Sequence, residues 1–311
     1  MQFRVLYYFL AIVFAVPLGF GALIKGIDFY QEITWDAPPW PPSTEKNQHP
    51  DHLRWGEAAF NRFDALDPEQ QTSMRLAISA NIAPLDEWIR EIAQQRFALL
   101  CLGENHDDYI RRFASEHIFN VLRYDVLFVE ATPDELENIL ERIDAGDGRV
   151  ELLGADLSYV IRSIRRMNPD VEIIGIEETP TQREARQKTL EGGRETSVEK
   201  NLRAKLKPGK QHMIFIGAFH CSNTHNWLFY RLRQNPGNLA DSESRSVRLT
   251  REHIEGPIEA FTYFLDEIDV APKTHFVIRD NASLPPQLKE WFPFFQANDL
   301  GISESMVVFR P

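Results

Sequence analysis

The segment FALLCLGENH, residues 97–106, contains the pattern that decides the fold: an apolar run followed at once by glycine, an acid and a histidine. Three later apolar runs resemble it, namely VLFVEA (126–131), EIIGIE (172–177) and MIFIGA (213–218). None of the four alternates between apolar and polar residues, which is typical of strands buried on both faces. Stretches with helical periodicity separate the runs. The sequence therefore predicts right-handed crossovers and a mostly parallel central sheet with helices on both faces.

The C-terminal part of the chain has a different pattern. Apolar runs at 246–250, 260–265, 275–279 and 305–310 follow one another with little predicted helix between them. We expect them to add antiparallel or mixed strands to the same sheet. The predicted fold class is α/β.

The first fifty residues predict a membrane anchor and a spacer. Residues 5–24 (VLYYFLAIVFAVPLGFGALI) are uncharged, and a helix of this length reaches about 30 Å, the thickness of a bilayer core. Arg4 precedes the run and acidic residues follow it, which favours a single-pass protein with its body on the non-cytoplasmic side. A cleaved signal peptide, giving a secreted or periplasmic protein, is the alternative. The expected organisation is an anchor at 1–25, a proline-rich spacer at 26–50 and one α/β domain at 51–311.

Charge and cysteine content narrow the classes of partner. The chain has 34 Lys and Arg against 46 Asp and Glu, a formal charge of -12, and such a surface repels a phosphate backbone. We therefore expect no nucleic acid; the expected partners are the bilayer, through residues 5–24, and a small-molecule or peptide substrate. Two cysteines, Cys101 and Cys221, are too few for a four-thiolate zinc site, and they leave one disulfide open. A nucleophilic Cys221 beside His220 is a less favoured alternative.

Ionisable residues follow all four apolar runs. They are Glu104 and His106 in GENH (103–106), Glu130, Glu177, and His220 in GAFH (217–220). The carboxyl ends of parallel strands share one edge of an α/β sheet, where ligands usually bind. Any one of these acids is equally typical of a helix cap or a solvated loop. Their occurrence at all four strand ends indicates one site.

These motifs resemble the signature of the superfamily that contains the erythromycin esterases, the ChaN haem-binding lipoproteins and the Tiki/TraB proteins. In RETSVEKN, the positions of Arg194, Glu195, Val198 and Asn201 are similar to the arginine, acid, apolar and asparagine positions of the helix that precedes the second histidine motif in these families. The resemblance extends over residues 97–225. The Gly-Glu-x-His spacing is closer to the ChaN and Tiki type than to the esterase type, which has one more residue between Glu and His.

The resemblance implies a pocket built from four residues, and three more are secondary candidates. The four are Glu104, His106, Glu130 and His220; the secondary candidates are Glu177, Arg194 and Asn201.

Paired histidines and carboxylates permit two kinds of chemistry. We expect a membrane-anchored hydrolase of an ester or peptide bond, in which His106 is the general base, His220 is a second acid or base, and Glu104 and Glu130 orient them. The same four residues are also an acceptable ligand set for a divalent metal ion that activates water. A non-catalytic haem- or metal-binding protein of the ChaN type is the alternative function. The sequence has no Gly-x-Ser-x-Gly elbow, Walker loop or His-Glu-x-x-His helix, so it does not support a serine hydrolase, a nucleotide-dependent enzyme or a zincin.

Overall fold

The computed structural model describes residues 50–95, 97–189, 192–224, 226–236, 239, 244–252, 256–292 and 303–310. These residues belong to one compact unit, Asn47–Pro311. The predicted anchor, and the spacer up to residue 49, lie outside them. Within the described ranges, no helix is both long and apolar enough to cross a bilayer.

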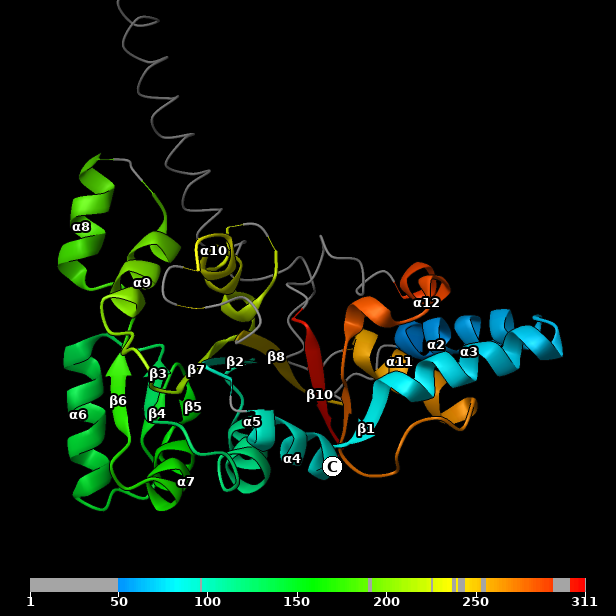
Figure 1. Cartoon of the computed structure of the whole chain (residues 1–311), viewed down its shortest axis with the longest axis horizontal. Coiled ribbons are helices and arrows are strands. Elements are labelled where there is room, and N and C mark those ends of the chain that lie inside the picture. Colours follow the sequence, from blue (N-terminus) through cyan, green and yellow to red (C-terminus); the bar gives the residue numbers. More distant parts are fainter. Residues whose placement is uncertain are drawn as a thin grey trace, which may run out of the picture. The chain divides into compact units, whose positions relative to one another are not determined.

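An eight-stranded sheet forms the centre of this unit, in the order β1-β9-β10-β8-β2-β7-β3-β6 (Figure 1). The strands from β10 to β6 in this order are parallel, and β9 is antiparallel to both of its neighbours. The strands are β1 (Ile82–Pro84), β2 (Leu99–Glu104), β3 (Val126–Val129), β6 (Glu172–Gly175), β7 (His212–Gly217), β8 (Ser244–Arg251), β9 (Phe276–Ile278) and β10 (Ser305–Phe309). The expectation of an α/β fold with a mostly parallel sheet is confirmed.

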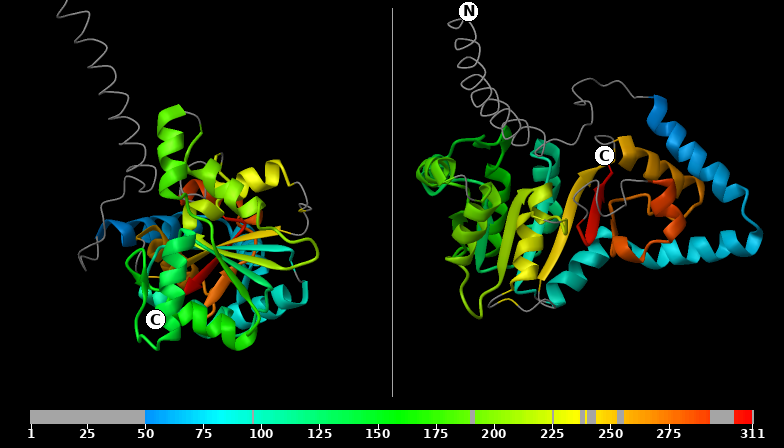
Figure 2. Two further views of the ribbon diagram at one scale, coloured as in Figure 1. Left: turned by 90° about the vertical axis from the view of Figure 1, so that its left-hand side faces the viewer. Right: turned by 90° about the horizontal axis from the view of Figure 1, so that it is seen from above.

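Helices cover both faces of the sheet, as two views of the ribbon show (Figure 2). Alternate residues of β2 point to opposite faces: Leu100 and Leu102 to one core, Leu99 and Cys101 to the other. The first core includes residues of α4 (Leu85–Gln95), α5 (Asp108–Phe113), α6 (Pro133–Asp144) and α7 (Ser158–Met167). The second includes residues of α9 (Arg194–Arg203) and α10 (Leu228–Gln234). Because the central strands are buried on both faces, apolar and polar residues do not alternate along them.

A third core lies at the β1 end of the sheet and corrects one expectation. It contains residues of α2 (Pro50–Asp64), α3 (Pro68–Asn81), α11 (Gly256–Glu267) and α12 (Pro286–Trp291) (Figure 1). The run 260–265, predicted as a strand, is part of α11. Ile258, Phe261 and Leu265 recur at helical spacing on its buried face, and α2 packs on α11 where Gly56 leaves room for the backbone of Ala260. The other three C-terminal runs are strands, but only β9 is antiparallel to its neighbours.

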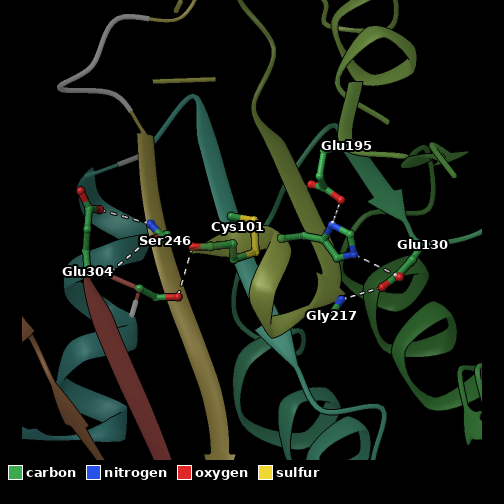
Figure 3. Close-up of a disulfide and its surroundings, with 9 residues drawn as sticks. Cys101, Glu130, Glu195, Gly217, Ser246 and Glu304 are labelled. Atoms are coloured by element: carbon green, nitrogen blue, oxygen red, sulfur yellow. Dashed lines mark hydrogen bonds and ion pairs between the residues drawn. A yellow bond between two sulfur atoms is a disulfide. The ribbon is translucent and has the colours of Figure 1, made fainter. Parts of the chain in front are cut away.

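A disulfide joins two parts of the chain that are 120 residues apart. Cys101 in β2 is bonded to Cys221, in the turn directly after β7, with 5.5 Å between their Cα atoms (Figure 3). Both cysteines are fully buried. The alternative of a nucleophilic Cys221 is therefore wrong for this structure, because its sulfur is not a free thiol.

Replacing both Cys101 and Cys221 with alanine should lower the free energy of unfolding by about 4 to 5 kcal/mol, because the bond restricts a long loop of the unfolded chain. Urea unfolding of the parent and the double variant measures the difference. A reductant should lower the midpoint of the parent to that of the variant and leave the variant unchanged. Equal midpoints without reductant would contradict the disulfide.

Candidate active site

The four predicted site residues lie together at the carboxyl ends of three adjacent strands. Glu104 ends β2, Glu130 follows β3, and His220 lies in the 3-10 turn η2 (Ala218–Cys221) after β7. Glu130 lies between the two imidazoles: its Oε2 is 3.5 Å from His106 Nε2, and its Oε1 is 3.3 Å from His220 Nε2. The parallel register of β2, β7 and β3 produces this convergence, because it places the three strand ends at one edge.

Two glycines allow the close approach of these strand ends. A Cβ on Gly103 would lie 2.7 Å from the Cα of Ala218, so only glycine lets η2 pack directly on the end of β2. A Cβ on Gly217 would lie 3.1 Å from His106 Nε2 and 3.2 Å from Glu130 Oε2. A side chain at position 217 would therefore press on both groups.

His106 is held in an uncommon backbone conformation. Its φ is 50°, in the left-handed region, which is rare for residues other than glycine and is more frequent at functional sites. This conformation turns the ring back toward its own strand, so that Nδ1 lies 3.2 Å from Glu104 Oε1. The His106 side chain is 28% exposed, whereas that of His220 is only 4% exposed.

Arg111, which the sequence analysis missed, neutralises Glu104. Its guanidinium is buried and donates to both oxygens of Glu104, at 2.8 Å and 3.1 Å from Nε and 2.6 Å from Nη2. Its Nη1 donates to the carbonyl oxygens of Leu152 and Ala155, and its Nη2 lies 3.3 Å from His106 Nδ1. A signal was present in the sequence, because Arg111 shares the buried helical face of Ser115 and Ile118, at spacings of four and seven.

His220 is enclosed between the carboxylates of Glu195 and Glu130, which are labelled in Figure 3. Glu195 Oε1 lies 2.8 Å from Nδ1, and Glu130 lies on the other side of the ring. Burial alone would lower the pKa of His220, but the charges of Glu195 and Glu130 outweigh burial and raise the pKa to about 10. His220 is therefore an imidazolium at neutral pH. Glu195, noted in the sequence only through the resemblance, keeps its buried Oε2 without a hydrogen-bond partner among the described residues.

Glu130 is the carboxylate with the largest number of partners in the site. Its Oε2 accepts a hydrogen bond of 2.7 Å from the backbone N–H of Gly217, and its Oε1 is 2.5 Å from Arg194 Nη2. Burial alone would raise the pKa of Glu130, but His220, with His106 and Arg194, holds the pKa well below its usual range. Glu130 thus remains ionised.

The three secondary candidates of the sequence analysis, Glu177, Arg194 and Asn201, differ in how closely they are connected to the site. Glu177 belongs to the site, since its two oxygens bind Arg194 at 2.8 Å and 2.7 Å. Its neighbour Glu178 instead binds Arg186 of α8 (Pro180–Thr189). Asn201 donates to the carbonyl oxygens of Ile176 and Glu177, so it positions the backbone of Glu177.

The arrangement does not fit a resident metal ion. Both oxygens of Glu104 are bound by Arg111, and Glu130 is bound by Arg194 and the Gly217 N–H. Both ring nitrogens of His220 already face carboxylates, Nδ1 that of Glu195 and Nε2 that of Glu130. In the part of the chain that the structure describes, no group of three or more His, Cys, Asp or Glu is placed to hold a metal. The geometry therefore favours chemistry that uses the side chains themselves.

Comparison with known proteins found no match: no protein-family model fits the chain, and no curated protein or solved structure is significantly similar to it. The function must therefore be inferred from the geometry of the site.

The raised pKa of His220 predicts how stability depends on pH. The folded protein binds the His220 proton more tightly than the unfolded chain, whose histidines titrate at about 6.5. The ion pairs of His220 therefore stabilise the fold fully below about pH 6.5, and this contribution is lost as the pH rises toward about 10. The difference in unfolding free energy between the parent and His220→Gln should shrink across this window, as measured by urea unfolding at several pH values.

His212 provides the matched control. It is also buried, but burial lowers its pKa, and its ring contacts backbone groups of Ala98 and Lys207 instead of carboxylates. The difference between the parent and His212→Gln should stay constant from pH 7 to pH 10. If the difference in unfolding free energy between the parent and His220→Gln also stays constant from pH 7 to pH 10, then His220 is neutral in the folded protein.

Proposed function

We propose that the protein is a hydrolase of ester or peptide bonds in which His106 activates the attacking water. The observation that supports this proposal is the difference between the two histidines. His220 is an enclosed imidazolium, whereas His106 is partly exposed and has one nitrogen directed at a carboxylate and the other at the space beside Gly217. A partly exposed imidazole backed by a carboxylate is the usual arrangement of a general base.

The proposal assigns the proton of His106 to Nδ1. Glu104 Oε1, 3.2 Å away, accepts it, and Arg111 Nη2, 3.3 Å from Nδ1, donates instead to Glu104 at 2.6 Å, so the lone pair lies on Nε2. The 3.5 Å between Nε2 and Glu130 Oε2 is long for a direct hydrogen bond, so Nε2 remains free to accept a proton from water. Glu104 and Glu130 would then stabilise the imidazolium that forms.

The proposed reaction follows from this assignment. Nε2 takes a proton from water as the water oxygen forms a bond to the carbonyl carbon of the substrate. In this proposal, Arg194, a partly exposed cation that binds Glu130 and Glu177, stabilises the negative charge that develops on the carbonyl oxygen. When the tetrahedral intermediate collapses, the bond to the leaving oxygen or nitrogen breaks and His106 returns the proton to that atom. The products are a carboxylic acid and an alcohol or amine.

The proposal also covers the superfamily to which the protein belongs and the side of the membrane on which its body lies. The GENH, Glu130 and GAFH motifs support membership of the superfamily of the erythromycin esterases, ChaN and Tiki proteins, and residues 5–24 support a single-pass anchor. The disulfide between Cys101 and Cys221 supports a body on the non-cytoplasmic side, because disulfides persist in oxidising compartments.

A screen of 4-nitrophenyl esters and fluorogenic peptides with the full-length protein tests the function. His106→Ala should reduce kcat by at least about a hundredfold, because general base catalysis is lost. Its melting temperature should stay close to that of the parent, since the ring is partly exposed. A chelator should leave the activity of the parent unchanged.

His117→Gln is the matched control, because His117 is also partly buried but lies against Phe113 and His275, outside the site. It should retain the activity of the parent. Activity that survives in His106→Ala would exclude the proposed base. A visible absorption band of the purified parent that disappears in His106→Ala would instead support the haem-binding alternative.

The space beside Gly217 gives a second test. In Gly217→Ala, the new methyl group would press on His106 Nε2 and Glu130 Oε2. We expect kcat to fall at least about tenfold with little change in KM, because the group that moves is the base. Steady-state kinetics measures kcat and KM, and a thermal melt measures the stability of the variant. A loss of stability with unchanged kcat in the folded fraction would contradict this role for Gly217.

A further inference from the structure

Four aromatic rings meet where α5 contacts β9 and β10, outside the candidate active site. They belong to Phe113 at the end of α5, His117 in the π-helical turn η1 (Ala114–Ile118), His275 just before β9 and Phe309 at the end of β10. The ring centres of His117 and His275 are 4.7 Å apart, and Phe113 lies 5.1 Å from His275 and 5.3 Å from Phe309. These four residues, here called the ring cluster, join α5 to the two strands.

His275 uses its imidazole to extend the contact between β9 and β10. The pairing of the two strands ends at Val308 and Phe276. Beyond this pair, the backbone N–H of Arg310 donates to Nδ1 of His275 at 3.0 Å. A protonated imidazole carries a hydrogen on both nitrogens and accepts no hydrogen bond. This contact therefore exists only while His275 is neutral.

The neighbour of His275 in the ring cluster is a second titratable ring. Two imidazolium ions at the separation of His117 and His275 repel each other. Both side chains are partly exposed, so protons can reach them without global unfolding. Acid therefore acts on the ring cluster in two ways: it removes the hydrogen bond to Arg310, and it places like charges side by side.

Among the described residues, two titratable groups act on the charge of His275. His117 opposes a proton on His275, and Asp86, in the first turn of α4, favours one. Burial and His117 together outweigh Asp86 and lower the pKa of His275. Other charged side chains on the surrounding elements interact with one another: Arg310 with Asp266 and Glu252, Lys273 with Asp266, Arg279 with Glu87 and Glu91, Arg112 with Glu116, and Arg251 with the ring of Tyr109.

We propose that His275 and His117 form an acid-sensitive latch, which fastens the end of β10 to β9 and α5 at neutral pH and opens when the two histidines take up protons. The latch does not depend on the proposed hydrolase function. It bears on the same site, however, because α5 also carries Arg111, whose guanidinium binds Glu104. Opening of the latch would loosen the helix that supports this ion pair.

The lowered pKa of His275 gives the sign of the pH dependence. A histidine in the open latch titrates at about 6.5, whereas the closed latch holds His275 neutral to lower pH. The contribution of His275 to closure is therefore fully present above about pH 6.5 and is lost as the pH falls through the lowered pKa. Between pH 7.5 and pH 5.5, one such proton shifts the equilibrium toward the open latch by up to about tenfold.

Hydrogen exchange of the full-length protein, followed by mass spectrometry at pH 7.5 and pH 5.5, measures the opening of the latch. The exchange rate of segment 305–310, which contains β10 and Arg310, is divided by the rate of an unstructured peptide of the same sequence at the same pH. This ratio should rise about tenfold at pH 5.5. Segment 212–217, which is β7 in the centre of the sheet, should exchange more slowly at both pH values, because the latch opens locally.

Three variants assign the effect to the two histidines. In His275→Asn, the amide oxygen takes the place of Nδ1 and accepts the Arg310 N–H at any pH, so the rise should disappear. His117→Gln removes the neighbouring charge and should reduce the rise without abolishing it. His212→Gln is the matched control, because His212 is a buried histidine that accepts a backbone N–H outside the ring cluster, and it should keep the full rise.

Three results would overturn the latch. The first is an exchange ratio of segment 305–310 that is the same at both pH values in the parent. The second is a rise that persists in His275→Asn or that is abolished in His212→Gln. The third is equal exchange of segments 305–310 and 212–217 at pH 5.5, which would mean that acid unfolds the whole domain. If His275→Asn does not fold, the comparison of the parent with His117→Gln still decides, because an equal rise in both excludes the interaction of the two histidines.

Discussion

The need to neutralise buried carboxylates determines how this site is built. Glu104 and Glu130 are almost fully buried at the ends of β2 and β3, the strands on either side of β7, and an uncompensated charge there would cost several kcal/mol. Each acid therefore has its own cation: Arg111 from α5 binds Glu104, and Arg194 from α9 binds Glu130. These ion pairs fix helices from opposite faces of the sheet to the same edge. The geometry of the site therefore depends on these two ion pairs, whereas apolar cores pack the helices on the sheet.

That requirement also makes the two histidines different. His220 is itself one of the compensating cations, because it lies between Glu130 and Glu195 and keeps its proton. His106 has Glu104 and Arg111 beside Nδ1, whereas its Nε2 lies 3.5 Å from Glu130 Oε2 and next to Gly217. Two histidines near one carboxylate thus have different surroundings, and the proposal gives His220 the role of a fixed cation and His106 the role of the proton acceptor. We regard this division of roles as the basis of the proposed chemistry.

Two features hold the strand ends in register although they are distant in the chain. The Cys101–Cys221 bond fastens the turn that contains His220 to the strand that ends in Glu104, and Gly103 lets the two backbones meet. The rim of the site, by contrast, contains a residue whose backbone conformation costs stability. His106 has a positive φ although it is not a glycine. Strain next to a rigid, cross-linked site is consistent with function taking precedence over stability there.

The sequence by itself determined the central strands and their shared edge, because uninterrupted apolar runs and alternating helices are local patterns that specify a parallel sheet. It therefore placed Glu104, His106, Glu130 and His220 together. It did not determine that 260–265 is helical, since a short apolar run has no conformation of its own until a partner such as α2 packs against it. Only the tertiary structure decided the disulfide, the pairing of Arg111 with Glu104 and the protonation of His220. Each of these depends on distances between residues far apart in the chain, and burial gives those distances their energetic weight.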